Sequence, residues 1–206
     1  MRKYEQLENA PEPGGGRRII GRARGVSAVF LDRDGVIVIP EFRDRRSFAP
    51  RRLADFKLYP DAAPSLSRLK REGFVLAVVT NQPDVGRGLI LRSEVEAMHE
   101  ILQRELPIDA LKVCFHRQDD HCDCRKPKPG MILAAADELG IDLARSFMIG
   151  DRASDVEAGR AAGCGTVFID LGYDEPAPDA PDHVVRSVAE AAEIIIQTTA
   201  TAEGAA

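Results

Sequence analysis

The chain has 206 residues, 44% of them hydrophobic and 30% charged, which is typical of a globular protein and long enough for one domain with a substantial core. Its net charge of −5 gives no overall attraction to nucleic acid or to an anionic membrane, and no apolar stretch is long enough to span a bilayer. No apolar segment follows the basic residues at the N-terminus, so we expect no secretory signal, no membrane partner and a cytoplasmic location.

Apolar runs alternate with amphipathic segments between residues 26 and 197. We expect residues 1–25, rich in proline, glycine and arginine, to form a disordered extension, and residues 198–206 to form a disordered tail. The predicted strands are 28–31, 74–79, 110–115, 146–150 and 166–170, and the predicted helices are 61–72, 93–105, 129–139, 154–162 and 187–197. This alternation predicts a doubly wound, mostly parallel, Rossmann-like α/β sheet covered on both faces.

Several helix ends carry local signals. Asp61 is the expected N-cap of the first helix, Ser93 and Glu96 have the spacing of a capping box, and Gly140 follows the third helix as a typical stop. Residues 39–59 are basic and are expected to be irregular. Because no segment after the first or second strand is long enough for a separate lid domain, we expect a capless protein whose site is covered only by loops.

Two carboxylates, Asp32 and Asp34, directly follow the first apolar strand. Side chains of a strand alternate with period two, so both would project from the same side at the carboxyl end, where open α/β sheets bind ligands. Like charges this close repel each other unless a cation lies between them. Mg²⁺, a hard cation that prefers oxygen ligands, would relieve the repulsion.

Three cysteines and a histidine are crowded into residues 114–124, at the end of the third predicted strand and in the loop that follows it. The ligands Cys114, His116, Cys122 and Cys124 form the set expected for a closed tetrahedral zinc site. Four protein ligands leave no open position for water, so the predicted zinc is structural. Cys164 is expected to be a small buried residue, and His99 and His121 are expected at the surface.

Four separated motifs occur in the order seen in the haloacid dehalogenase (HAD) superfamily. They are Asp32-Arg33-Asp34-Gly35, Thr80-Asn81-Gln82, Cys122-Asp123-Cys124-Arg125-Lys126-Pro127 and Gly150-Asp151-Arg152. Over roughly residues 27–196 the chain resembles the small phosphatases of the heptose-bisphosphate and histidinol-phosphate group. The resemblance implies a Mg²⁺-dependent phosphoric monoester hydrolase that acts on a small phosphorylated metabolite.

The resemblance also assigns roles to the motif residues. Asp32 would attack phosphorus and form an aspartyl-phosphate, Asp34 would protonate the leaving alcohol and later deprotonate water, and Thr80 and Lys126 would contact the phosphoryl group. The expected substrate contacts are Asn81, Gln82, Arg125 and Arg152. The expected Mg²⁺ ligands are Asp32, Asp151 and the backbone carbonyl of Asp34, with Asp155 in support.

The motifs do not agree on one substrate. Residues 125–131 resemble the heptose-bisphosphate group, which implies hydrolysis of D-glycero-D-manno-heptose 1,7-bisphosphate at the 7-phosphate. The five-residue gap between His116 and Cys122 and residues 150–155 are closer to histidinol-phosphate phosphatases. Another small-metabolite phosphomonoesterase and a non-catalytic, zinc-stapled binding module are further alternatives. We expect a monomer.

The basic stretch 43–52 matches neither group. We hypothesise that Arg43, Arg45 and Arg46 lie near the mouth of the site and grip a second phosphate at the distal end of the substrate. A solvated charged loop is the alternative interpretation.

Overall fold

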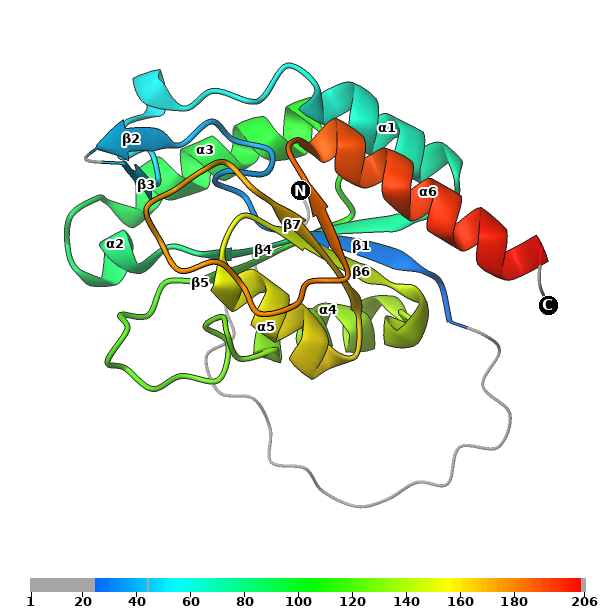
Figure 1. Ribbon diagram of the computed structural model, residues 1–206. Coiled ribbons are helices and arrows are strands. Elements are labelled where there is room, and N and C mark those ends of the chain that lie inside the picture. The colour runs from blue at the N-terminus through cyan, green and yellow to red at the C-terminus, as the bar shows by residue number, and fades with distance from the viewer. Residues whose placement is uncertain (1–24, 44, 205–206) are drawn as a thin grey trace.

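The computed structural model describes residues 25–43 and 45–204, so the predicted N-terminal extension lies outside the described residues apart from Gly25. Its centre is a sheet of six parallel strands in the order β5-β4-β1-β6-β7-β8. The strands are β1 (Ala28–Leu31), β4 (Val75–Asn81), β5 (Ala110–Cys114), β6 (Phe147–Gly150), β7 (Gly165–Ile169) and β8 (His183–Val185). The predicted doubly wound, mostly parallel sheet is confirmed (Figure 1).

Helices cover both faces of this sheet (Figure 1). One face carries α1 (Ala62–Arg71), α3 (Arg92–Glu105) and α6 (Val188–Gly204), and the other carries α4 (Gly130–Leu139) and α5 (Ala153–Ala162). Alternate residues of β1 enter the two hydrophobic cores: Val29 and Leu31 pack on the first face, and Ala28 and Phe30 on the second. A strand buried on both faces needs an unbroken apolar run, which is why this run was recognisable in the sequence.

The strand order reverses beside β1. From β1 the chain builds outward through β4 to β5, then crosses back to β6 and builds the other way through β7 to β8. A crevice opens at such a switch point outside the carboxyl ends of the strands, and open α/β sheets bind their ligands there. The crevice between β1 and β6 is therefore the expected position of the site.

The region predicted to be irregular contains a small antiparallel hairpin, β2 (Glu41–Arg43) and β3 (Arg46–Phe48), and a 3₁₀ turn at Leu53–Asp55. The short helix α2 (Pro83–Gly86), a second 3₁₀ turn at Leu143–Arg145 and the edge strand β8 were not predicted either. Three-residue strands and single turns show too few alternations to be recognised in a sequence. No lid domain is inserted among the described residues.

Two helix-end predictions were wrong and one was partly right. Helix α3 begins at Arg92, which places Ser93 inside the helix, so the predicted capping box does not form. The last helix extends to Gly204 and does not end at residue 197. Asp61 is the N-cap of α1, but its side chain makes no capping hydrogen bond. Gly140 ends α4 with φ of 66°, as predicted. None of the described helices is both long and apolar enough to cross a membrane.

Candidate active site

Three carboxylates meet at the switch point. Asp32 follows β1, and its backbone N–H donates to the carbonyl of Ile149 (2.9 Å), which extends the pairing of β1 with β6. Asp151 follows β6, and Asp155 lies in the first turn of α5. One oxygen of each carboxylate lies within 4.8 Å of the others. The sequence therefore located all three correctly at one edge of the sheet.

The electrostatics of this cluster fit a cation. Asp151 is 2% exposed, and neither of its carboxylate oxygens has a hydrogen-bond partner among the described residues. Burial, together with the charges of Asp32 and Asp155, raises the pKa of Asp151 well above its ordinary value. Buried carboxylates without partners are unfavourable unless a proton or a metal compensates them. The donor set, all oxygen, is the one that Mg²⁺ prefers.

The side chain of Lys126 places a positive charge beside two of the three carboxylates. Its fully buried Nζ lies 2.7 Å from Oδ1 of both Asp32 and Asp155, and it donates to the carbonyl of Val79 (2.8 Å). Burial alone would lower the pKa of Lys126, but Asp155 and Asp32 outweigh it and raise that pKa. Burial raises the pKa of Asp155 to about 6, against the opposing effect of Lys126. Lys126 therefore remains charged beside the predicted nucleophile.

The motif at the end of β4 holds other residues of the site. The side-chain amide of Asn81 donates to the carbonyl of Lys126 (3.1 Å) and accepts its N–H (3.2 Å), so it clamps the backbone of the lysine. Gln82 donates to Asp34 (2.8 Å) and to the hydroxyl of Thr80 (3.0 Å). Thr80 is 1% exposed and does not line the cavity described below. These contacts position neighbours, and the predicted contacts of the three residues with substrate stay predictions.

Asp34 is held from the opposite side by Arg33, which donates from Nη2 (2.9 Å) and from Nε (3.1 Å). Arg33 is fully buried, and its Nη1 lies 3.0 Å from Nε2 of His99. The prediction that His99 is a surface residue was wrong, because His99 is 0% exposed on the inner side of α3. Its helical position on the face shared with Met98 and Leu102 was the available signal. His121 is exposed, as predicted.

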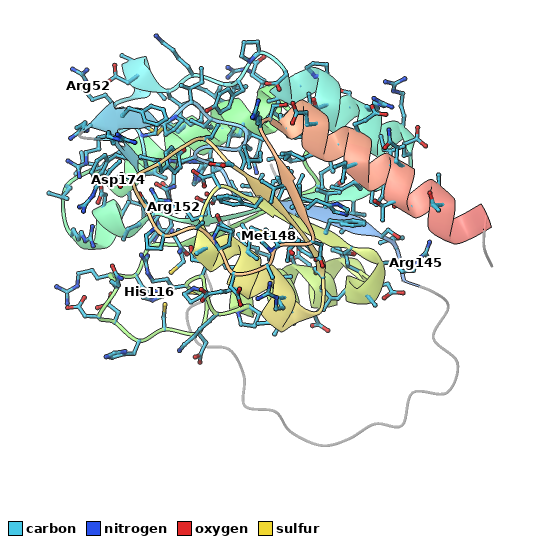
Figure 2. All side chains as sticks on the ribbon, in the orientation of Figure 1. Arg52, His116, Arg145, Met148, Arg152 and Asp174 are labelled. Atoms are coloured by element: carbon cyan, nitrogen blue, oxygen red, sulfur yellow. The ribbon has the colours of Figure 1, made fainter. Side chains whose placement is uncertain are left out.

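A cavity of about 710 Å³ opens above Asp32 and Asp34. Its walls come from β3, the ends of β4, the cysteine loop and the loop after β7, and both Arg152 and Asp174 lie in them (Figure 2). Arg125 lines the cavity, and its Nη1 is buried without a hydrogen-bond partner among the described residues. Arg152 instead binds Glu175 (2.8 Å) and the carbonyl of Ser47 (2.8 Å), which ties the roof of the cavity together.

Tyr173, in the loop after β7, was not predicted as part of the site. Its ring packs on Phe42 of β2, with the ring centroids 5.5 Å apart. Burial and the charge of Asp151 raise the pKa of its hydroxyl, which therefore stays protonated. No motif or periodicity marks this loop, so only the fold reveals that the hydroxyl of Tyr173 lies near Asp151.

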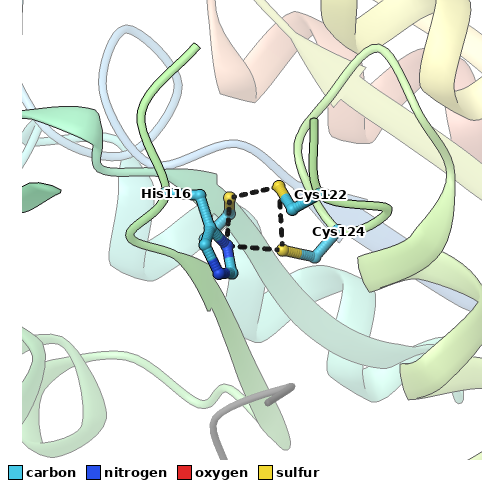
Figure 3. Close-up of side chains that lie close together, drawn as sticks. His116, Cys122 and Cys124 are labelled. Carbon is cyan, nitrogen blue, oxygen red and sulfur yellow. Dashed lines mark hydrogen bonds between the residues drawn. The ribbon is translucent and has the colours of Figure 1, made fainter. Parts of the chain in front are cut away.

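The side chains of four residues at the end of β5 and in the following loop lie close together (Figure 3): Cys114, His116, Cys122 and Cys124. Nδ1 of His116 lies 3.6 Å from Sγ of Cys114 and 3.3 Å from Sγ of Cys124. Sγ of Cys122 lies 3.5 Å from Sγ of Cys124 and 3.7 Å from Sγ of Cys114. A tetrahedron with Zn–S bonds of about 2.3 Å has edges of about 3.8 Å, so these side chains are arranged as zinc requires. The cluster could hold zinc with all four predicted ligands. Cys164 stays outside it, and burial raises the pKa of its thiol to about 12.

The sequence of the chain is similar to the sequences of known hydrolases. The sequence model of the HAD-hydrolase-like family matches residues 123–191. The D-glycero-beta-D-manno-heptose-1,7-bisphosphate 7-phosphatase of Escherichia coli K12 is 34% identical over 183 residues, which cover 82% of this chain and 93% of that enzyme. The Pseudomonas aeruginosa enzyme of the same name is 37% identical over 152 residues, 71% of this chain and 82% of its own. The chain belongs to the HAD family of hydrolases.

The fold of the chain is also similar to that of a solved structure. The D,D-heptose 1,7-bisphosphate phosphatase of B. bronchiseptica, complexed with magnesium and phosphate, is 28% identical with a TM-score of 0.71, and the match covers 84% of this chain and 99% of that one. The predicted family and class, a phosphoric monoester hydrolase of the HAD type, are confirmed. The role of each HAD motif residue stays a prediction.

Proposed function

We propose that the protein hydrolyses D-glycero-D-manno-heptose 1,7-bisphosphate at the 7-phosphate in a Mg²⁺-dependent reaction. The observation that carries the proposal is the near full-length match to enzymes of that name, which covers 93% of the Escherichia coli relative. The cavity supports it, since cationic side chains surround a buried carboxylate cluster. A phosphate monoester dianion needs such charges to stabilise its transition state.

Asp32 is the proposed nucleophile, because its carboxylate lies at the floor of the cavity and is held by Lys126. As its oxygen bonds to phosphorus, the bond to the sugar oxygen breaks, and Asp34 gives that oxygen its proton. Asp34 then takes a proton from the water that hydrolyses the aspartyl-phosphate. Mg²⁺, held by Asp32, Asp151 and the backbone carbonyl of Asp34 with support from Asp155, would neutralise phosphoryl charge.

The distal phosphate requires cations farther up the cavity wall. Of the three arginines named for this role, the structure places only Arg46 in that wall. Arg43 pairs with Glu41 and lies over the ring of Phe48. We therefore assign the distal phosphate to Arg46, with Arg125 available nearer the carboxylates. A guanidinium presents two parallel donors to a phosphate, which favours arginine for this task.

The cysteine cluster is proposed to hold structural zinc, since its four ligands would fill the coordination sphere. None of the four cysteines is paired in a disulfide, which supports the proposal of a reducing, cytoplasmic compartment. We also propose a monomer as the working unit.

The test measures phosphate release from heptose 1,7-bisphosphate, histidinol phosphate and p-nitrophenyl phosphate, with and without Mg²⁺. We expect the highest kcat/KM for the heptose bisphosphate, with heptose 1-phosphate as the product and Asp32→Asn inactive on all three. A higher kcat/KM for histidinol phosphate would overturn the substrate and favour the alternative suggested by the five-residue zinc-loop gap. Activity of Asp32→Asn within tenfold of wild type would overturn the covalent mechanism.

A further inference from the structure

A chain of buried polar contacts runs from helix α3 to the proposed acid. His99 lies 3.0 Å from Arg33 through its Nε2, and Arg33 contacts both oxygens of Asp34. His99 and Arg33 are both 0% exposed, and the guanidinium also lies over the ring of Phe56, 5.7 Å from its centroid. Burying a histidine and an arginine together is costly unless their hydrogen bonds are made, so this pair needs an explanation beyond core packing.

The chemistry of the pair fixes the state of the histidine. A guanidinium has only donors, so Nε2 of His99 must accept and carry no proton. Burial and the neighbouring charge of Arg33 lower the pKa of His99 well below its ordinary value, in agreement with a neutral ring. A neutral acceptor satisfies Nη1 without neutralising the guanidinium. The charge of Arg33 is therefore directed at Asp34.

Asp34 is held unequally at its two oxygens. Oδ2 accepts from Nη2 of Arg33 (2.9 Å) and from Gln82 (2.8 Å), whereas Oδ1 receives only a contact from Nε of Arg33 (3.1 Å), which it shares with Oδ2 (3.1 Å). The side chain of Asp34 is 12% exposed, and it lines the cavity. Oδ1 is thus the oxygen best able to carry a proton toward a bound leaving group.

We propose that His99 is a positioning residue, which fixes Arg33 and through it the carboxyl of Asp34 for proton transfer to the leaving oxygen. This inference rests on the proposed function, in which Asp34 is the acid. In that step the proton on Oδ1 moves to the leaving oxygen while the bond from phosphorus to that oxygen breaks and the bond from Asp32 to phosphorus forms. His99 touches neither substrate nor metal, and its effect is on the orientation of the acid.

Two aryl phosphates of nearly the same shape separate positioning from general damage. Phenyl phosphate releases a basic phenolate that needs a proton, whereas p-nitrophenyl phosphate releases a weakly basic anion that hardly does. The ratio kcat/KM reports only the steps up to departure of the phenol, so the later hydrolysis of the aspartyl-phosphate does not enter. Asp34→Asn is the benchmark and should lose activity mainly on phenyl phosphate.

Three variants of α3 are compared at fixed Mg²⁺ concentration. His99→Met removes the acceptor, His99→Gln returns an oxygen to the position of Nε2, and Met98→Leu is the matched control for packing of the same buried helix. If His99→Met fails to fold, His99→Asn is used in its place. Its side chain is polar, but it is too short for its amide oxygen to reach Arg33. Thermal unfolding of each variant is measured in parallel.

For His99→Met we expect kcat/KM to fall about 30-fold on phenyl phosphate and about threefold on p-nitrophenyl phosphate, in line with the effect of misplacing a general acid. His99→Gln and Met98→Leu should stay within about threefold of wild type on both. Equal losses on the two substrates, or none, would overturn the role of His99 if Asp34→Asn still shows the selective loss. If Asp34→Asn loses both activities equally, the proposed acid itself is wrong.

Discussion

Replacing Lys126 by methionine tests how the charges of the site are balanced. The substitution leaves Asp32 and Asp155 without the ammonium that lies 2.7 Å from each, in a position that is 3% exposed. Removing one partner of a buried ion pair destabilises a protein by about 3–5 kcal/mol. Lys126 lowers the pKa of Asp155, so without the lysine this pKa rises and the carboxyl is more easily neutralised by a proton. Because neutralisation offsets part of the loss, we expect the lower end of that range, about 3 kcal/mol.

The measurement is urea unfolding of Lys126→Met in Mg²⁺-free buffer without a chelator, so that any zinc is retained. With a slope of about 2 kcal/mol/M, the expected loss moves the midpoint down by about 1.5 M. Lys128→Met is the matched control on the same loop. Its pair with Asp123 is exposed to solvent, so the unfolding midpoint of this variant should stay close to that of wild type. Mg²⁺ should raise the midpoint more in Lys126→Met than in wild type, because the carboxylates of the variant have lost their cation.

The same variant should lose about 10²- to 10³-fold in kcat, since it lacks a cation aimed at the transferred phosphoryl group. The reasoning is refuted if Lys126→Met unfolds at the wild-type midpoint in Mg²⁺-free buffer and keeps kcat within tenfold of wild type. Unchanged stability would mean that the lysine does not stabilise the carboxylates of Asp32 and Asp155.

The remaining predictions concern other parts of the site. Gly35→Ala should abolish Mg²⁺-dependent activity, measured in a Mg²⁺ titration, while the protein still folds. The added Cβ would lie 2.0 Å from Oδ2 of Asp151, and the φ of +90° at Gly35 is unfavourable for alanine. Cys122→Ser should purify with far less than one zinc per chain and with a lowered kcat, as measured by elemental analysis and kinetics. A variant that has lost zinc but keeps normal stability and kcat would show that the cluster is incidental. Arg46→Gln should raise KM for a sugar bisphosphate about tenfold or more but leave p-nitrophenyl phosphate unaffected, whereas Arg43→Gln should change neither.

The sequence predicted the sheet and the edge carrying the site because both depend on short-range patterns. A buried parallel strand needs a continuous apolar run, and a carboxylate directly after such a run must lie at the carboxyl end of the sheet. Asp32 and Asp151 could therefore be placed from the order of residues alone. The sequence also predicted that the four proposed zinc ligands come together, since their close spacing along the chain is itself the signal.

The residues that the sequence misplaced depend on long-range contacts. His99 was assigned to the surface because a lone histidine on a helix carries no mark of its partner, and Arg33 is 66 positions away along the chain. The expected contact of Asn81 with substrate stays a prediction, but nothing in the sequence indicated that its amide also binds the backbone of Lys126. The capping box at Ser93 failed for a local reason, since the helix starts one residue earlier and Leu91 becomes the N-cap.

Backbone contacts also connect the cysteine cluster to Lys126. Cys114 ends β5 opposite Asn81 in the sheet, and its carbonyl accepts the N–H of Gln82 (2.7 Å). Cys124 lies two positions before Lys126, whose backbone Asn81 clamps from the other side. The backbone of the lysine thus lies between the cysteine cluster and the end of β4, and its side chain reaches the carbonyl of Val79 and the carboxylates of Asp32 and Asp155. Because the same short loop carries Cys122, Cys124 and Lys126, we expect disruption of the cluster to displace the lysine as well.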